Sequence, residues 1–173
     1  MKNFQGRTAG FTLIELLVVA VILAVLAGVV VPVVSGRLEA SRDARRLSDM
    51  NAIVSAIEQY YLDNNAYPAS NANAAYGGWD VSQDGDLIPD LVKGGYLKDM
   101  PADPINDDTY HYRYYLYAKG TAGCVGTGPF YVLGIKNFET PEYKTKSTGY
   151  FKCTGRDWNA EFAYVTGGGA SFQ

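Results

Sequence analysis

One carboxylate of this chain lies where carboxylates are rarely tolerated. Glu15 falls inside an apolar stretch that begins at Phe11, and residues 16–34 carry no charged side chain. An unpaired ionisable group at such a depth in a membrane is costly, so it indicates a function and needs a partner. Cleavage after Gly10 would supply one, because the new amine of Phe11 would be positively charged. We expect Glu15 to pair with the Phe11 amine of a neighbouring copy of the chain, which would set the register of assembly.

A second group of candidate ligands lies in one acidic loop. The oxygen-bearing side chains that could bind a cation there are Asp80, Ser82, Asp84, Asp86 and Asp90. Their spacing around Gly85 is similar to that of calcium-binding loops, although Leu91 stands where an EF-hand has its bidentate glutamate. We expect the chain to require no cofactor, but this loop is a candidate site for one Ca²⁺. A simple solvated turn is the alternative.

The remaining reactive side chains are scarce. Cys124 and Cys153 are the only cysteines, and both follow the apolar stretch, so a single disulfide formed in an oxidising compartment is the natural interpretation. Two buried thiols are the alternative. His111 is the only histidine, and no second His or Cys lies near it in a metal-ligand spacing. A catalytic triad could be built only around this residue, between two tyrosines that look structural, and we therefore expect no enzyme.

The elements that position Glu15 begin with a short basic segment. Residues 1–10 carry Lys2 and Arg7 and are expected to be a leader peptide, followed by a transmembrane or filament-core helix over residues 11–35. A cleaved secretory signal is the competing explanation, but the uncharged run is too long for one. Within it, Pro32 removes a backbone hydrogen bond and should bend or locally open the helix. Gly28 and Pro32 are also tolerated in ordinary membrane helices.

The residues around Gly10 form a specific motif. Residues 10–17 read GFTLIELL, which resembles the prepilin processing motif of bacterial type IV pilins and type II secretion pseudopilins. The resemblance implies that prepilin peptidase cleaves between Gly10 and Phe11 and methylates the new amine, and that Glu15 serves in assembly. It also implies that Gly28 and Pro32 lie where family members have helix-weakening residues, which would let the helix extend in an assembled filament.

The helix should continue beyond the membrane as an amphipathic segment. Apolar side chains recur at steps of three and four at Leu47, Met50, Ile53, Val54, Ile57, Tyr60 and Tyr61, and 63–65 should end the helix. Four arginines follow the apolar run and would lie beside the membrane before assembly: Arg37, Arg42, Arg45 and Arg46. Residues 36–173, including this half of the helix, are expected to form one globular head.

The head should contain a small antiparallel sheet. Strand-like runs occur at residues 110–117, 130–136, 148–153 and 161–166, after an irregular stretch with a short helical turn at 86–97. In the first run the face carrying Leu116 should pack on the long helix. The predicted class is therefore α+β, with a long N-terminal helix packed on a small antiparallel sheet, which is the type IV pilin fold that the resemblance implies.

The function that these features favour is structural. We expect a homo-oligomeric helical filament outside the cell, of the type IV pilus kind, for adhesion, motility or DNA uptake. The implied partners are prepilin peptidase, an inner-membrane assembly platform and, before assembly, the membrane, with the head outside. Fifteen basic against 18 acidic residues favour no specific nucleic acid. The alternatives are the major pseudopilin of a type II secretion system, whose head is similar over residues 67–104, and a membrane-anchored calcium-binding or adhesive domain.

Overall fold

The computed structural model describes residues 10–146 and 151–170, apart from the side chains of residues 29–33 and 144–146. Nine of the ten leader residues therefore lie outside the described part. The chain divides into two compact units, Met1–Leu38 and Glu39–Gln173, and one helix passes through the boundary. The second unit corresponds to the predicted head, and that name is used for it below.

Helix α1 runs without a break from Leu13 to Asn64, through Gly28 and Pro32. Its end, predicted at residues 63–65, is set by two asparagines. Asn64 Nδ2 donates a hydrogen bond to the carbonyl of Tyr60 at 2.9 Å, and Asn65 adopts a left-handed conformation with φ 52°. Asparagine tolerates that conformation better than most residues and so terminates the helix here.

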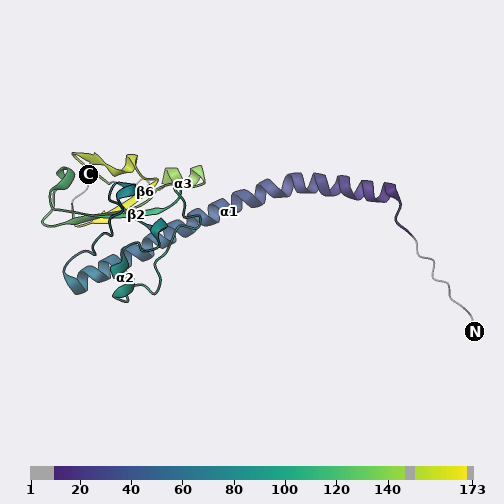
Figure 1. Cartoon of the computed structure of the whole chain (residues 1–173). Coiled ribbons are helices and arrows are strands. Elements are labelled where there is room, and N and C mark those ends of the chain that lie inside the picture. Colours follow the sequence, from purple (N-terminus) through teal and green to yellow (C-terminus); the bar gives the residue numbers. More distant parts are fainter. Residues whose placement is uncertain (1–9, 147–150, 171–173) are drawn as a thin grey trace, which may run out of the picture. The chain divides into compact units, whose positions relative to one another are not determined.

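The head contains a four-stranded antiparallel sheet in the order β1-β2-β3-β6 (Figure 1). Its strands are β1 (Asp80–Val81), β2 (Tyr112–Tyr117), β3 (Phe130–Ile135) and β6 (Tyr164–Gly168). A separate two-stranded sheet pairs β4 (Lys152–Cys153) with β5 (Arg156–Asp157). The shorter helices are η1 (Ala74–Tyr76), η2 (Ser82–Asp84), α2 (Pro89–Lys93), η3 (Thr121–Gly123), α3 (Pro141–Lys146) and η4 (Trp158–Ala160). The α+β class predicted from the sequence is confirmed.

One face of the four-stranded sheet packs on the second half of α1. Met50, Ile53 and Ile57 of the helix lie in one buried cluster with Tyr112 and Tyr114 of β2. Leu116 packs against the same cluster, so the predicted orientation of this strand is confirmed. The cluster also includes Leu87 and Ile88 from the preceding loop and Leu91 from α2.

The opposite face carries a second core. Trp158, Phe162 and Phe151 cover β3 on this side, together with the two cysteines. Every residue of β3 is consequently buried, as expected for a strand covered on both faces. Gly134 of β3 permits the close packing, because a Cβ there would lie 2.5 Å from the Phe162 ring.

Two of the four predicted strands need correction. The run at 148–153 yields only β4, which pairs with β5 and not with the main sheet, while residues 147–150 lie outside the described part. The run at 161–166 starts late, because Glu161 caps the 3₁₀ helix η4 and the strand begins at Tyr164. The fourth strand of the main sheet is instead β1, in a stretch predicted to be irregular. Two residues are too few to show the alternation that identifies strands in a sequence.

Candidate functional site

Glu15 and Thr12 form a capping box at the start of α1. Glu15 Oε2 accepts hydrogen bonds from the Thr12 backbone N–H and hydroxyl, both at 2.8 Å, while the Glu15 N–H donates to Thr12 Oγ1 at 3.3 Å. The two side chains thus satisfy N–H groups that have no partner inside the helix. No described residue donates a hydrogen bond to Glu15 Oε1. This carboxylate can therefore cap its own helix and still accept a second donor.

The predicted cleavage point precedes the helix. Gly10 and Phe11 are exposed and lie outside regular structure, and the first helical residue is Leu13. The peptide bond between them therefore lies outside the helix. A peptidase that binds an extended chain could reach it without breaking helical hydrogen bonds.

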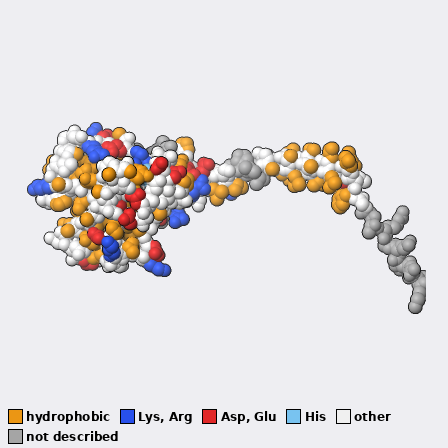
Figure 2. All heavy atoms as spheres, in the orientation of Figure 1, with side chains coloured by type: hydrophobic (Ala, Val, Ile, Leu, Met, Phe, Trp, Pro, Cys, Tyr) orange, Lys and Arg blue, Asp and Glu red, His pale blue; other side chains and the backbone are white. Residues whose placement is uncertain are grey.

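The side chains that follow are apolar and uncovered. Phe11 is 81 % exposed and Leu26 is 55 % exposed, and the large apolar residues between them are similarly open (Figure 2). A Cβ at Gly28 would meet no atom within 4 Å. The Pro32 side chain lies outside the described part, as do those of the other residues from 29 to 33.

The predicted membrane span thus overlaps side chains that the structure does not describe. Within the part of the chain that the structure describes, no helix is both long enough and apolar enough to cross a membrane.

The five predicted calcium ligands do not converge. Asp84 and Asp86 each accept a hydrogen bond from a side-chain amide, of Asn73 and Asn71 respectively, at 2.5 Å. Ser82 Oγ donates to Asn106 and accepts from the Tyr112 N–H, and Asp90 lies in α2. Within the described ranges, no three His, Cys, Asp or Glu side chains are grouped as a metal site. The amides of Asn71 and Asn73, which precede the loop in the sequence, lie against it, and calcium binding there stays a prediction.

Asp80 differs from the other acidic residues of this loop because it is buried. Its Oδ2 accepts hydrogen bonds from the Asn71 N–H at 2.9 Å and the Ile88 N–H at 3.0 Å. Burial, with Asp86 and Asp84 nearby, raises the pKa of Asp80 to about 6 despite these two bonds. Asp80 thus fixes the loop through backbone contacts.

Cys124 and Cys153 form the predicted disulfide. Their Cα atoms are 5.0 Å apart, and both residues are buried in the second core. The bond joins the segment after β2 to the β4–β5 hairpin, so it closes this hairpin over the sheet.

A buried ionic cluster centred on Arg46 was not predicted from the sequence. The Arg46 guanidinium contacts Asp43 at 2.6 Å, Asp103 at 2.6 Å and Glu139 at 2.7 Å. Arg42 pairs with the same Glu139 through a two-point contact. Arg42 and Arg46 thus make ionic contacts within the head, and their location beside the membrane before assembly stays a prediction.

The signal for this cluster was present in the sequence. Asp43 and Arg46 continue the apolar stripe of Met50 and Ile53 at the same helical spacing of three and four. A charged pair on the buried face of an amphipathic helix needs partners from elsewhere in the fold. Asp43 accepts three more hydrogen bonds from the backbone of Glu139 and from Thr140.

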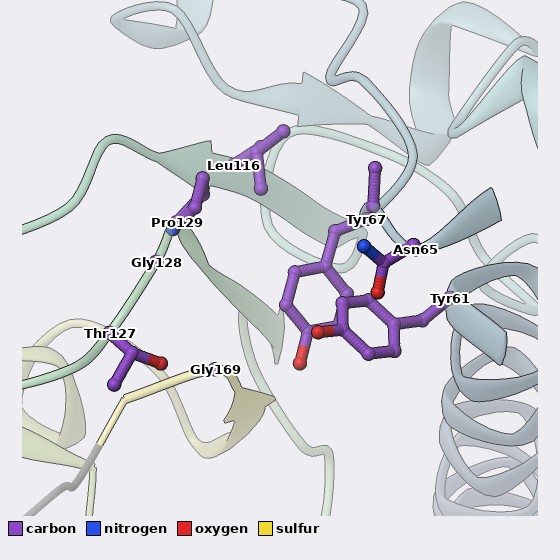
Figure 3. A pocket seen from close by; sticks show the side chains of 9 residues that line it. Tyr61, Asn65, Tyr67, Leu116, Thr127, Gly128, Pro129 and Gly169 are labelled. Carbon is purple, nitrogen blue, oxygen red and sulfur yellow. The ribbon is translucent and has the colours of Figure 1, made fainter.

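A pocket of about 370 Å³ opens where α1 ends. Tyr61 and Tyr67 form one wall, with their rings stacked at a centroid distance of 4.5 Å, and Asn65 lies beside them (Figure 3). None of the described residues that line the pocket carries a charge. Its described lining therefore contains no carboxylate, imidazole, amine or thiol.

Two family profiles match the chain in succession. The prokaryotic N-terminal methylation motif matches residues 6–31, and the type II secretion system protein G family matches residues 33–128. The first covers Gly10, Phe11 and Glu15. The second covers more than half of the chain, from the start of the amphipathic helix to the residues just before β3.

Curated relatives agree with the second profile. Type II secretion system core protein G of Escherichia coli K12 is 37 % identical, over 70 % of this chain and 87 % of the relative. The corresponding proteins of Vibrio cholerae and Pseudomonas aeruginosa are 34 % and 38 % identical, over 74 % and 69 % of this chain and 92 % and 80 % of theirs. No solved structure matches the chain.

These matches favour the secretion alternative over the pilus that the sequence analysis placed first. Extra strands and a disulfide are the features of this chain that look more like an adhesive or motility pilin. β3, β6 and Cys153 all lie beyond residue 128, where the protein G profile ends. They extend the shared head and do not argue against membership. The chain is a type IV pilin-like filament subunit that belongs to the type II secretion system protein G family.

Proposed function

We propose that this chain is the major pseudopilin of a type II secretion system, the repeating subunit of a filament that spans the periplasm. The observation that carries the proposal is the succession of the methylation motif and the protein G profile along one chain. The relatives are named as core proteins of that secretion system. The role is structural, as it rests on packing and not on catalysis.

Processing is the first step of the proposal. Prepilin peptidase cleaves between Gly10 and Phe11 and methylates the amine of Phe11. The location of this bond ahead of the first helical residue supports the assignment. The new positive charge lies at the N-terminus of α1, where the helix dipole is already positive, so an unpaired amine there is unfavourable.

Assembly then places a carboxylate beside that amine. Glu15 Oε2 is held by Thr12, which leaves Oε1 to accept a hydrogen bond from the methylated amine of a neighbouring subunit. In an environment without water the pair is strong once both charges are present, and either charge alone is costly. The pairing therefore admits one axial register between subunits.

The uncovered apolar side chains supply the remaining driving force. The exposed apolar area of the side chains from Phe11 to Leu26 is larger than a soluble monomer normally leaves open to water. We propose that inner-membrane lipid covers them before assembly and the helices of other subunits afterwards, with an assembly platform mediating the transfer.

A secretion assay tests the proposal. In a strain that lacks the gene, export of proteins across the outer membrane should stop, and the wild-type gene should restore it. The Glu15→Ala variant should be processed but should not restore export. Asp99→Ala serves as the matched control, because Asp99 is an exposed carboxylate distant in sequence from α1.

Two outcomes would contradict the proposal. If export is normal without the gene while surface pili disappear, the chain is a pilus subunit. If Glu15→Ala accumulates normally and supports full export, the ion pair with the Phe11 amine is not part of assembly.

A further inference from the structure

The only histidine of the chain is completely buried and is held in one protonation state by its neighbours. His111 Nδ1 lies 2.9 Å from the backbone oxygen of Asp107, and Arg113 Nε lies 2.8 Å from His111 Nε2. A carbonyl can only accept a hydrogen bond and a guanidinium can only donate one. His111 must therefore carry its proton on Nδ1 and accept at Nε2, and the ring is neutral.

The charges around His111 oppose a second proton. Burial lowers the pKa of His111, and the cations Arg113 and Lys136 lower it further, while the bond to Asp107 and the charge of Asp103 oppose this. A proton on Nε2 would also face the N–H of Arg113, so their hydrogen bond would be lost and two positive charges would be in contact.

The same two side chains hold a segment that is distant in sequence. The ring of Tyr76, at the end of η1, lies edge-on to His111 at a centroid distance of 5.5 Å. The Arg113 guanidinium lies over that ring at 5.3 Å. The Tyr76 hydroxyl donates to Asp108 Oδ1 at 2.9 Å, and Gln83 Nε2 donates to the same oxygen at 3.2 Å. His111 and Arg113 thus hold the segment around Tyr76 against the start of β2, next to the point where β1 pairs with β2.

We propose that His111 and Arg113 form an acid-sensitive latch, which holds the segment around Tyr76 on the sheet when His111 is neutral and releases it when Nε2 takes a proton. The charged and titratable groups that face the latch come from five elements. They are Asp103, Asp107 and Asp108 from the preceding loop, Arg113 from β2, Lys136 from the end of β3, Glu161 from the end of η4 and Tyr76 from η1.

The direction of the pH effect follows from proton binding. The closed latch binds fewer protons than the open one, because the closed environment lowers the pKa of His111 from its ordinary value of 6.5. The closed state is therefore fully favoured above about pH 6.5 and loses that advantage as the pH falls further. This inference is independent of the proposed function, because it concerns the head alone.

A histidine titration of the full chain in a mild detergent tests the first half of the proposal. With labelled histidine, the imidazole nitrogen signals report both the tautomer and the midpoint, and one histidine gives one set of signals. We expect the Nδ1–H tautomer at pH 7.5 and a midpoint below 6.5. In Arg113→Met the midpoint should move upward. An Nε2–H tautomer, or a midpoint at or above 6.5 in the wild type, would overturn the proposal.

Hydrogen exchange tests the release itself. After correction for the intrinsic effect of pH, the backbone amides of residues 74–81 should exchange several-fold faster at pH 5 than at pH 7.5, while those of β3 should not change. Asp80 of the same segment also titrates near pH 6, so the comparison is made in an Asp80→Asn background, which removes that titration. In this background His111→Gln, whose side chain stays neutral, should abolish the difference between the two pH values. The proposal fails if the acceleration persists in His111→Gln, if β3 accelerates equally, or if residues 74–81 are unaffected in the wild type.

Discussion

Arg46 Nε donates a hydrogen bond to Asp103 Oδ2 at 2.6 Å, and both side chains are completely excluded from solvent. Arg46 also lies over the Tyr110 ring, 4.9 Å from its centroid. One arginine thereby joins the middle of α1 to the loop that precedes β2 and, through Glu139, to the segment after β3. The head is attached to its helix by an ionic cluster as well as by the apolar core.

Replacing Arg46 should therefore destabilise the head strongly. Arg46→Met leaves Asp43 and Asp103 buried without their cation, which should lower the free energy of unfolding by about 3 to 5 kcal/mol. Arg45→Met is the matched control, because the Arg45 side chain is 63 % exposed and its ion pair with Asp49 is long, at 3.7 Å. This substitution should lower the free energy of unfolding by less than about 1 kcal/mol. Urea unfolding of the full chain in detergent measures both. Equal losses in the two variants would show that the cluster does not stabilise the head.

The same cluster predicts a loss of stability in acid. The Arg42 hydrogen bond, aided by Arg46, holds the pKa of Glu139 below its usual range, although burial opposes this. A carboxyl group whose pKa is lowered in the folded protein stabilises the fold when the pH is above its ordinary pKa of about 4.3. This contribution is lost as the pH falls through the lowered pKa. Glu139→Gln should be less stable than the wild type at pH 7, with the gap narrowing below about pH 4. A constant gap between pH 7 and pH 3 would contradict this account.

Loss of the disulfide should weaken the second core. The bond closes a loop with a sequence separation of 29, so its removal in a Cys124→Ser, Cys153→Ser double variant should cost about 3 to 4 kcal/mol. Reduction of the wild type should lower its melting temperature and leave the double variant unchanged. If the reductant lowers both melting temperatures equally, the effect does not arise from this bond.

Thr12 should matter for assembly through its hydroxyl. Thr12→Val removes one of the two donors to Glu15 Oε2 and the acceptor for the Glu15 N–H, and caps of this type contribute about 1 kcal/mol. We expect fewer filaments in a cross-linking assay at equal levels of processed protein. Thr12→Ser keeps the hydroxyl and should restore the wild-type yield. If both variants assemble like the wild type, the cap has no role in positioning Glu15.

Much of the fold followed from periodic patterns in the sequence. The steps of three and four around Met50 and Ile53 identified the buried face of α1, and the alternation around Leu116 gave the correct face of β2. The disulfide could be inferred because only one pairing of two cysteines exists. These features depend on local spacing or on counting, which the sequence contains in full.

The remaining features depend on contacts between distant segments. Asp103 and Glu139 are separated from Arg46 by 57 and 93 positions, and neither stands in a motif that marks it as a partner. The acidic residues from Asp80 to Asp90 had the spacing of a calcium loop, but amides of Asn71 and Asn73 lie against two of them. Spacing along the chain could not show that these amides fold back onto the loop.

The ionic cluster also determines how the head bears mechanical load. Arg42, Asp43 and Arg46 lie within a single turn of helix and bind the segment at Glu139 and Thr140. A force applied along α1 is therefore transmitted to the rest of the head through these bonds. The apolar contacts of Met50 and Ile57 come later along the helix. Under axial tension, the short and directional bonds of this cluster are thus the first contacts between the helix and the rest of the head.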